Sequence, residues 1–544
     1  MRITRLLIAN RGEIAVRVAR TCRELGIETV AVYSTADRDS AVVRMADHAV
    51  HIGPGPARRS YQLVPALIEA ARTTGADAVH PGYGFLSEDP DFAEVCHANG
   101  LVFVGPRPDV MKVLGDKAMT RAAMHDAGLP LLPGTVEPVS TAAEAMAAAV
   151  DVGFPVIIKA VAGGGGRGMT IVRSRRELPG AFQRTRATAA AVFGDGRVYL
   201  ERYLPQARHV EVQVLCDQHG NGVHLGDRDC STQRRHQKLV EEAPAPGLSD
   251  DTRAAMGEAS VAGALSVGFT GAGTMEFLLD GDGRYYLMEM NARLQVEHPV
   301  TEMVTGIDLV EQQLLVAQGE PLRFGQSDIE LRGSSIECRI NAEDPRRDFL
   351  PTPGTIVRLQ LPGGPFTRVD THAIAGGPIP PDYDSLLAKV VVWAPDRPRA
   401  AARMARALTE LVVEGPGVCT TTGFVATIID HPLFRAARHT TDLIERIQNP
   451  QHVDGTKEAS VMIDKSSGLN RTDLRDLLVT EVGIDRALLT ELPNDNLSEL
   501  GLDSMAQVEL GVVLRTQHGI AQIPEHTNTL SFHQLADLLC GTSA

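Results

Sequence analysis

Residues 289–299 read Glu289-Met290-Asn291-Ala292-Arg293-Leu294-Gln295-Val296-Glu297-His298-Pro299. From Glu289 to Glu297 the odd positions are polar or charged and the even positions are apolar, which is the period of a β-strand that buries one face. A solvated strand face gives the same alternation, but such faces usually carry Lys, Thr and Ser. Two carboxylates around a guanidinium therefore favour a functional site along a strand that runs to Glu297.

A β-hairpin is predicted where this stretch begins. Residues 274–280 alternate as a strand, Gly281-Asp282-Gly283-Arg284 is turn material, and residues 285–288 begin the return strand. If Asp280 pairs with Tyr285, counting back along both strands puts Glu276 opposite Glu289. Like charges directly opposite destabilise a sheet, so the pattern asks for a cation. Carboxylates beside nucleotide phosphates suit Mg²⁺, and we expect a metal site here rather than a structural accident.

Length and composition indicate a globular protein of several domains. The chain has 544 residues, of which 43% are apolar and 22% are charged. Its net charge of −15 argues against a general nucleic-acid binder. The sequence has no apolar run of the roughly 18 residues that a membrane helix needs. Its first residues lead into a strand rather than a signal peptide, so we expect a cytoplasmic protein with no membrane partner.

The seven cysteines are scattered, with no C-x-x-C pair and no Cys/His spacing typical of zinc. We interpret them as reduced thiols, mostly in the core. Cys230 alone lies in a charged segment, and a direct role for it is the alternative interpretation.

The first hundred residues predict a parallel sheet covered by helices. Strand-like segments at residues 5–9 and 28–33 flank a helix-like segment, and further strands are expected near residues 78–80 and 102–104. The glycine pattern G-x-G-x-x-G is absent, so dinucleotide binding has little support. The loop at residues 80–88 directly follows a strand end, where such sheets bind ligands.

A lysine followed by a glycine run predicts a nucleotide lid. Lys159 lies in the strand-like residues 156–160, and Gly163 to Gly166 separate it from a second strand at residues 169–172. The amides of such a flap can close over phosphates. A plain flexible turn is the alternative, and a P-loop is excluded because no Gly-Lys-Ser/Thr ends the run.

Residues 227–238 pack several cations into a short segment, and the acidic pair Glu241-Glu242 follows. A solvated charged loop is one interpretation. An anion channel beside an ATP site is better motivated, because such a density of like charge repels itself without anions.

Taken in order, these segments resemble biotin carboxylase of the ATP-grasp superfamily. The resemblance runs from about residue 1 to 447 and rests on Arg11 to Ala15, His80 to Glu88, Lys159 with its glycine lid, Gln233 to Lys238, Glu289 to Pro299, and Glu337 to Glu343. It implies an α/β fold with a parallel-sheet N-terminal domain at residues 1–114. Residues 115–447 then form the ATP-grasp region, with a lid at about residues 131–203, and the α+β C-terminal domain.

The last part of the chain differs in character. Residues 448–466 read as a linker. Residues 467–544 show three apolar helix faces, which predict a small helical bundle: Leu474, Leu477, Leu478; Met505, Val508, Val512, Val513; and Phe532, Leu535, Leu538, Leu539. Leu500-Gly501-Leu502-Asp503-Ser504-Met505 resembles the phosphopantetheine attachment motif of acyl and peptidyl carrier proteins, and this resemblance implies an all-α four-helix bundle. A serine at a helix start is usually only an N-cap, but the Asp-Ser-Met context favours 4′-phosphopantetheine on Ser504.

The family resemblance implies catalytic roles. Glu297 would deprotonate bicarbonate, which attacks the γ-phosphate of ATP to give carboxyphosphate, and Arg339 would stabilise the biotin enolate. Bicarbonate would be held by Lys238, Arg293, Gln295 and the Val296 backbone. Tyr83 would flank biotin. Mg²⁺ or Mn²⁺ would be held by Glu276, Glu289 and Asn291.

The resemblance also implies the nucleotide contacts. Lys117, Lys159 and the lid glycines Gly164, Gly165 and Gly166 would meet the phosphates. The remaining nucleotide site would be formed by Glu201, Leu204, His209, Gln233, His236 and Leu278.

Partners follow from what the chain lacks and adds. Biotin attachment domains carry a lysine between methionines, and no Met-Lys-Met occurs here. Biotin would therefore come on a separate biotin carboxyl carrier protein that also serves a carboxyltransferase. A phosphopantetheinyl transferase would modify Ser504, and the family implies a homodimer.

Of three possible functions, the residues favour the first. The first is ATP-dependent carboxylation of biotin, coupled to carrier-tethered polyketide or fatty-acid biosynthesis. The second is a binding module whose ATP-grasp region has become a docking scaffold. The third is a biotin-independent ATP-grasp ligase that carboxylates a substrate tethered to the carrier domain.

Overall fold

The computed structural model describes residues 2–135, 137–162, 168–448 and 471–480, together with residues 497, 510, 514, 531, 532 and 534–536. The chain divides into two compact units, residues 1–450 and 451–544. The lid glycines Gly164, Gly165 and Gly166 and the candidate attachment site Ser504 lie outside the described residues.

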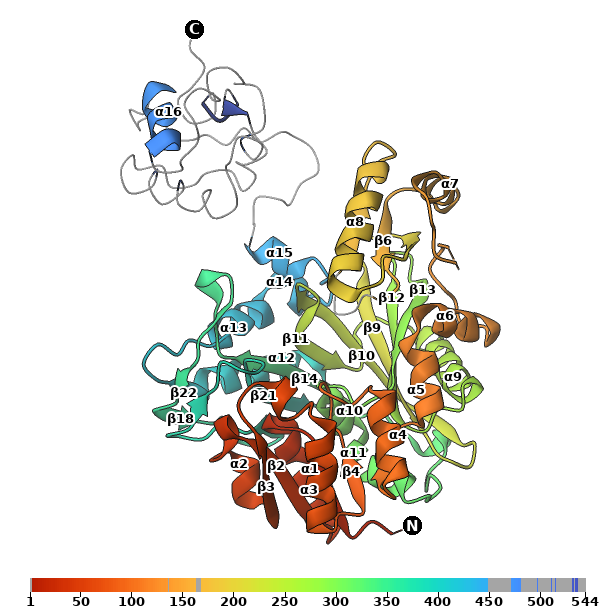
Figure 1. Cartoon of the computed structure of the whole chain (residues 1–544), viewed down its shortest axis with the longest axis vertical. Coiled ribbons are helices and arrows are strands. Elements are labelled where there is room, and N and C mark those ends of the chain that lie inside the picture. Colours follow the sequence, from red (N-terminus) through yellow and green to blue (C-terminus); the bar gives the residue numbers. More distant parts are fainter. Residues whose placement is uncertain are drawn as a thin grey trace. The chain divides into compact units, whose positions relative to one another are not determined.

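The N-terminal domain is the predicted parallel sheet (Figure 1). Its order is β3 (His48–Gly53), β2 (Glu28–Ser34), β1 (Arg5–Ile8), β4 (Ala78–His80) and β5 (Val102–Phe103). Strand β3 was not predicted from the sequence. The helices are α1 (Gly12–Glu24), α2 (Ala41–Met45), α3 (Val64–Thr74) and α4 (Pro90–Ala98), followed by α5 (Pro108–Gly115) and α6 (Lys117–Asp126).

Both faces of this sheet are covered. Leu6 and Ile8 on β1 pack in one apolar cluster with α1, whereas Leu7 between them packs in another with α3. A parallel strand buried on both faces is expected to be apolar throughout, and this explains the continuous run Leu6-Leu7-Ile8. The loop of residues 80–88 follows β4 and therefore lies at the carboxyl ends of the strands, where such sheets bind ligands.

The predicted lid is a small three-stranded sheet with two helices. Its order is β7 (Met169–Val172), β6 (Val156–Ala160) and β8 (Val198–Arg202), and its helices are α7 (Ala142–Val152) and α8 (Leu178–Phe193). Lys159 pairs with Met169 across the antiparallel β6–β7 pair, so the two strands predicted to flank the glycine run are confirmed.

An eight-stranded antiparallel sheet, which we call the central sheet, lies in the unit of residues 1–450. Its order is β13 (Tyr285–Asn291), β12 (Gly271–Leu279), β9 (Arg208–Cys216), β10 (Gly222–Arg234), β11 (Gln237–Ala243), β14 (Ser334–Asn341), β21 (Leu386–Ala394) and β19 (Thr367–Thr371). The helices around it are α9 (Asp250–Ser266), α10 (His298–Thr305), α11 (Leu309–Ala317), α12 (Arg397–Glu410), α13 (Thr422–Asp430), α14 (Pro432–Arg435) and α15 (Leu443–Gln448).

Three short strand pairs complete the C-terminal domain. They are β15 (Glu343–Asp344) with β16 (Leu350–Pro351), β17 (Gly354–Thr355) with β20 (Pro378–Ile379), and β18 (Arg358–Gln360) with β22 (Val412–Glu414).

The hairpin of β12 and β13 confirms one prediction and corrects two others. Glu276 lies opposite Glu289, as predicted, but Tyr285 pairs with Leu279 rather than with Asp280. The register then shifts by one residue before Glu289, which restores the predicted pair. The expected strand to Glu297 is wrong, because β13 ends at Asn291 and the chain turns into α10.

The charged segment at residues 227–238 is not a solvated loop. It forms most of β10 and the start of β11, joined by a turn at Arg235 and His236, both of which have positive φ. Arg228 is fully buried and donates to Glu211 Oε1 at 2.6 Å. Its charge is therefore neutralised within the sheet.

The second unit is described only in part. Helix α16 (Arg471–Thr480) buries Leu474, Leu477 and Leu478, the face predicted for it. Phe532 and Leu535 of the third predicted face are buried too. The second predicted face, with Leu538 and Leu539 of the third, lies outside the described residues.

Candidate active site

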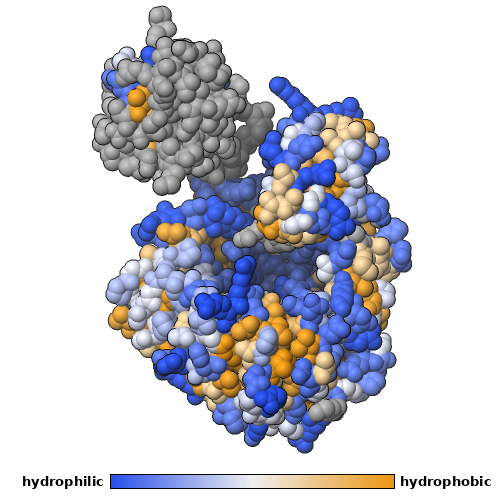
Figure 2. Space-filling model, viewed as in Figure 1, coloured by the Kyte–Doolittle hydropathy of each residue, from blue (hydrophilic) through white to orange (hydrophobic). Residues whose placement is uncertain are grey.

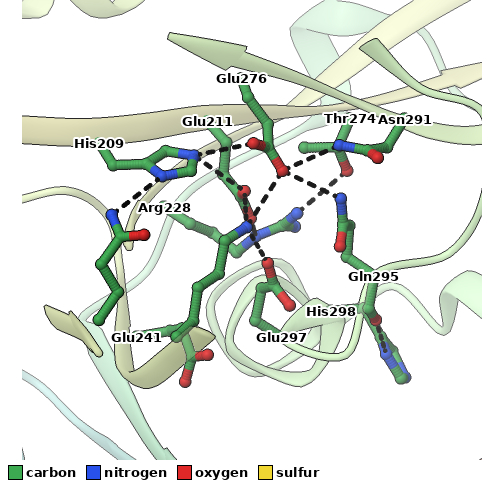
Figure 3. Close-up of polar contacts among 12 residues, drawn as sticks. His209, Glu211, Arg228, Glu241, Thr274, Glu276, Asn291, Gln295, Glu297 and His298 are labelled. Atoms are coloured by element: carbon green, nitrogen blue, oxygen red, sulfur yellow. Dashed lines mark hydrogen bonds and ion pairs between the residues drawn. The ribbon is translucent and has the colours of Figure 1, made fainter. Parts of the chain in front are cut away.

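Lys238 on β11 is surrounded by three carboxylates. Its Nζ lies 2.6 Å from Glu211 Oε2, 3.2 Å from Glu276 Oε1 and 2.5 Å from Glu297 Oε1. All three acids are buried, and they point toward a common centre (Figure 3). A lysine held this way can present its charge to an anion without a change of rotamer.

Glu297 lies between two cations. Besides Lys238, it accepts a hydrogen bond of 2.9 Å from Arg339 Nη2. Burial alone would raise the pKa of Glu297, but Lys238, Arg339 and the more distant Arg228 hold it well below its usual range. The carboxylate is therefore ionised at neutral pH and can accept a proton from a bound acid.

Arg339 is anchored from its other side. Its Nε donates 2.6 Å to Glu241 Oε1. Burial raises the pKa of Glu241 to about 7, with Arg339 opposing the rise. Arg339 is thus fixed between two acids, with its Nη2 directed at Glu297.

The predicted metal ligands lie together on β12 and β13. Asn291 Nδ2 donates 2.9 Å to Glu276 Oε1, and Glu276 faces Glu289 across the ladder. Among the described residues, none forms a hydrogen bond with the Glu289 carboxylate. Two carboxylates and an amide oxygen are hard donors of the kind that Mg²⁺ takes alongside phosphate oxygens, so the residues present fit this ion.

Glu276 also contacts the predicted nucleotide-site histidine. His209 Nε2 lies 3.1 Å from Glu276 Oε2, and its Nδ1 is 3.5 Å from Gln233 Nε2. Burial alone would lower the pKa of His209, but Glu276 raises it. His209 and Gln233, both predicted for the nucleotide site, therefore lie next to each other.

Arg293 and Gln295 lie in the loop after β13. Arg293 Nη1 donates 3.1 Å to Gln295 Oε1, and Arg293 Nε donates 2.8 Å to Glu88 Oε2 from the loop at residues 80–88. Tyr83 in that same loop donates its hydroxyl to Glu13. The site therefore joins the N-terminal domain to the central sheet.

The predicted lid contributes a further cation, Lys159. Lys159 and Arg121 both form ion pairs with the buried Glu201, whose strand β8 pairs with β6. Lys117 begins α6, and burial lowers its pKa while Glu289 raises it in part. The predicted phosphate contacts Lys117 and Lys159 thus reach the site from separate elements.

The remaining predicted nucleotide contacts are Leu204, His236 and Leu278. Leu278 on β12 lies opposite His209 on β9, and both Leu278 and Leu204 are half-buried. His236 is exposed at the turn between β10 and β11. Between the part of the surface that bears α8 and the part formed by the N-terminal domain, Figure 2 shows a hollow with hydrophilic walls.

Glu211 is a site residue that was not predicted from the sequence. It pairs with both Lys238 and Arg228 and opposes Glu276 across β9 and β12. The alternation His209-Val210-Glu211-Val212-Gln213 has the same period as the stretch after Glu289 and would have indicated it. Cys230 is buried beside Glu211 and Glu297, and burial raises its thiol pKa well above the usual value, so the thiol stays protonated.

Comparison with known protein families covers nearly the whole chain. Residues 2–111 match the family described as the biotin carboxylase N-terminal domain, and residues 337–446 match the biotin carboxylase C-terminal domain. Residues 116–324 match the ATP-binding domain of the carbamoyl-phosphate synthase L chain. Residues 472–527 match the phosphopantetheine attachment site.

Named relatives and solved structures agree with these matches. The biotin carboxylase of Nostoc sp. is 50% identical over 447 residues, which is 82% of this chain and 100% of that protein. That of Allochromatium vinosum is 54% identical over 414 residues, covering 76% and 92%. The crystal structure of the biotin carboxylase of Campylobacter jejuni in a βγ-ATP complex aligns with a TM-score of 0.79 at 44% identity, over 82% of this chain and 99% of that one.

A second solved structure bears on the ligands. The biotin carboxylase domain dimer of 2-oxoglutarate carboxylase from Hydrogenobacter thermophilus, in complex with MgADP, ADP and bicarbonate, aligns with a TM-score of 0.79 at 44% identity, over 84% of this chain and 100% of that one. Among the described residues, no helix is both long and apolar enough to cross a membrane.

Proposed function

The chain belongs to the biotin carboxylase family of the ATP-grasp ligases and carries a phosphopantetheine-attachment domain, and from this we propose that it carboxylates biotin on a separate carrier protein. The co-substrates are ATP, as its magnesium complex, and bicarbonate. The observation that carries this proposal is the ionised Glu297 held between Lys238 and Arg339.

In the first step bicarbonate becomes a nucleophile. Lys238, Arg293, Gln295 and the Val296 N–H bind the anion, and its O–H proton passes to Glu297. A bicarbonate oxygen then attacks the γ-phosphorus of ATP, the bond from that phosphorus to the β–γ bridging oxygen breaks, and ADP leaves. The product is carboxyphosphate. Because water hydrolyses this intermediate, the lid strands must close over it.

The metal site acts at the same step. Glu276 and Glu289, supported by Asn291, would hold Mg²⁺, which neutralises charge on the transferred phosphoryl group. Lys117 and Lys159 contact the same phosphates, together with the lid glycines Gly164, Gly165 and Gly166. Glu201, Leu204, His209, Gln233, His236 and Leu278 surround the rest of the nucleotide.

In the second step carboxyphosphate breaks down to CO₂ and phosphate. The phosphate takes the N1′ proton of biotin, and the N1′ nitrogen then attacks CO₂ to form carboxybiotin. Arg339, permanently charged, stabilises the ureido enolate that forms in between. Tyr83 lines the approach of biotin.

The carrier domain links this reaction to tethered substrates. We infer 4′-phosphopantetheine on Ser504, added by a phosphopantetheinyl transferase. A carboxyltransferase would use carboxybiotin from the separate carrier, and the enzyme would act as a homodimer, like the dimeric biotin carboxylase domain from Hydrogenobacter thermophilus. The match of residues 472–527 also keeps a second candidate, biotin-independent carboxylation of a group on the Ser504 arm.

Phosphate release from MgATP and bicarbonate, with and without free biotin, tests the proposal. We expect biotin to stimulate release in the wild type and Glu297→Ala to abolish that stimulation. Bicarbonate-dependent release that ignores biotin would instead favour the second candidate. No bicarbonate dependence at all would refute both.

A further inference from the structure

A fully buried lysine lies on β21, outside every role assigned above. Lys389 is 0% exposed, and its Nζ lies 2.9 Å from Glu13 Oε1. Burial alone would lower the pKa of Lys389, but Glu13, Glu337 and Asp370 raise it. A buried ammonium is costly unless it is paired and hydrogen-bonded. A second contact, besides Glu13, stabilises the ammonium of Lys389.

That second contact is a backbone carbonyl of the loop between β13 and α10, which we call the site loop. Lys389 Nζ donates 2.8 Å to the Val296 oxygen, across 93 residues of sequence. This carbonyl belongs to the peptide plane that joins Val296 to Glu297. Lys389 therefore fixes the plane that leads directly into the catalytic carboxylate.

The preceding peptide plane is fixed as well. His298 Nδ1 lies 2.8 Å from the Gln295 oxygen (Figure 3). The Gln295 carbonyl shares its plane with the Val296 N–H, which is the donor assigned to bicarbonate. Lys389 and His298 thus hold the two planes on either side of the Val296 Cα atom.

The register of the central sheet explains why Lys389 reaches this loop. Lys389 lies directly opposite Arg339 in the β14–β21 pair, so both side chains project from the same face. The other face of these strands packs Cys338 and Val390 into an apolar cluster with α12. One strand pair therefore supplies both the cation that contacts Glu297 and the cation that holds the peptide before it.

Glu13 extends this support to the N-terminal domain. Its Oε1 pairs with Lys389 and also accepts the Tyr83 hydroxyl. Glu13 lies in the first turn of α1, and Tyr83 lies in the loop assigned to biotin. The buried pair of Glu13 and Lys389 therefore contacts both the site loop, at Val296, and the loop that carries Tyr83.

We propose that Lys389 is a positioning residue that sets the affinity for bicarbonate by holding the Val296–Glu297 peptide. This inference rests on the bicarbonate site proposed above. It assigns Lys389 no contact with a substrate.

Steady-state kinetics of the full chain tests this, with bicarbonate and ATP varied separately. Lys389→Arg keeps the charge but displaces the donor. The double variant Glu13→Gln/Lys389→Met removes both charges together, and replacing both members of a buried pair is tolerated far better than removing one. In both we expect KM for bicarbonate to rise roughly tenfold or more, because small displacements in a site have such effects. KM for ATP should change less than about twofold.

Two further variants separate the possible failures. Arg253→Met breaks an ion pair that joins α9 to the central sheet, 2.6 Å from Arg253 Nε to the buried Asp227, and should change neither KM. Gln295→Ala tests the bicarbonate site itself. If Gln295→Ala raises KM for bicarbonate while both Lys389 variants leave it unchanged, or raise both KM values equally, the positioning role is wrong. If Gln295→Ala has no effect, the proposed bicarbonate site is wrong.

Discussion

Glu276 and Glu289 lie directly opposite each other in the β12–β13 ladder, and a register shift of one residue at Met288 brings them there. Without that shift Glu276 would pair with Met288, and Glu289 would not face it. The bulge thus places two acids side by side against the usual preference of a ladder. An arrangement with this cost is explained if the acids hold a cation.

Replacing Glu289 by Gln should therefore weaken the affinity of the site for magnesium while it leaves the hairpin intact. We expect the Mg²⁺ concentration for half-maximal ATP cleavage to rise by roughly tenfold or more, because disturbing even the residues that support metal ligands lowers metal affinity by that factor. The temperature of the thermal unfolding midpoint without ligands should be unchanged or slightly higher, because a like-charge pair is removed. Asp282→Asn, in the turn of the same hairpin, is the control and should alter neither. An unchanged magnesium requirement in Glu289→Gln would remove this residue from the metal site.

The same hairpin shows what the sequence can predict. Alternation located both strands and the turn, but not the extra residue in β13, because apolar Met288 fits either register. The predicted pairing was one residue off at Asp280, and the bulge cancelled that error at Glu276. Alternation also continued past Asn291, although the backbone leaves the sheet there. Polar residues alternate in that loop because they line the site, not because they form a strand.

Other site residues left weaker local signals. Glu211 sits in an alternating strand, yet its partners Arg228 and Lys238 lie in a segment that also read as a loop. Lys389 stands in the apolar run Leu387-Ala388-Lys389-Val390-Val391 and gave no signal at all. Its contact with Val296 depends on how distant strands are ordered in the sheet, which no local pattern encodes.

Arg339→Met should separate the two half-reactions. Arg339 contacts Glu297 and Glu241, and its proposed task begins only when biotin loses its proton. We expect biotin carboxylation to fall by about 10²-fold or more, as when a donor to a developing anion is lost. Bicarbonate-dependent ATP cleavage without biotin should fall far less. Equal loss of both activities would mean that Arg339 serves the first step, through Glu297.

Ser504 can be tested independently of catalysis. Incubation of the full chain with a phosphopantetheinyl transferase and coenzyme A should add one phosphopantetheine group to the intact mass. Ser504→Ala should show no addition, and Ser531→Ala, in the same domain but outside the motif, should be modified like the wild type. An equal gain of mass in Ser504→Ala would show that Ser504 is not the attachment site.

The buried pair of Arg11 and Asp37 should make the stability of the first unit depend on pH. Arg11 donates to both Asp37 oxygens, at 2.7 and 2.8 Å, and Tyr61 adds a bond of 2.6 Å. Burial alone would raise the pKa of Asp37, but Arg11 and Tyr61 lower it below its usual value. A carboxyl whose pKa is lowered by folding stabilises the folded state above its unfolded pKa, and this contribution disappears as the pH falls through the folded pKa.

Asp37→Asn should therefore cost about 3–5 kcal/mol at pH 7, the usual effect of breaking a buried pair, and progressively less below pH ~4. The thermal midpoints of wild type and variant, measured from pH 7 down to pH 3, should converge. Glu69→Gln is the matched control, because Arg72 also binds both Glu69 oxygens, at 2.9 and 2.7 Å, but on the exposed surface. Its effect should be small throughout, since water screens exposed pairs. A gap between wild type and Asp37→Asn that stays constant across this range would show that Asp37 acts through packing rather than through its charge.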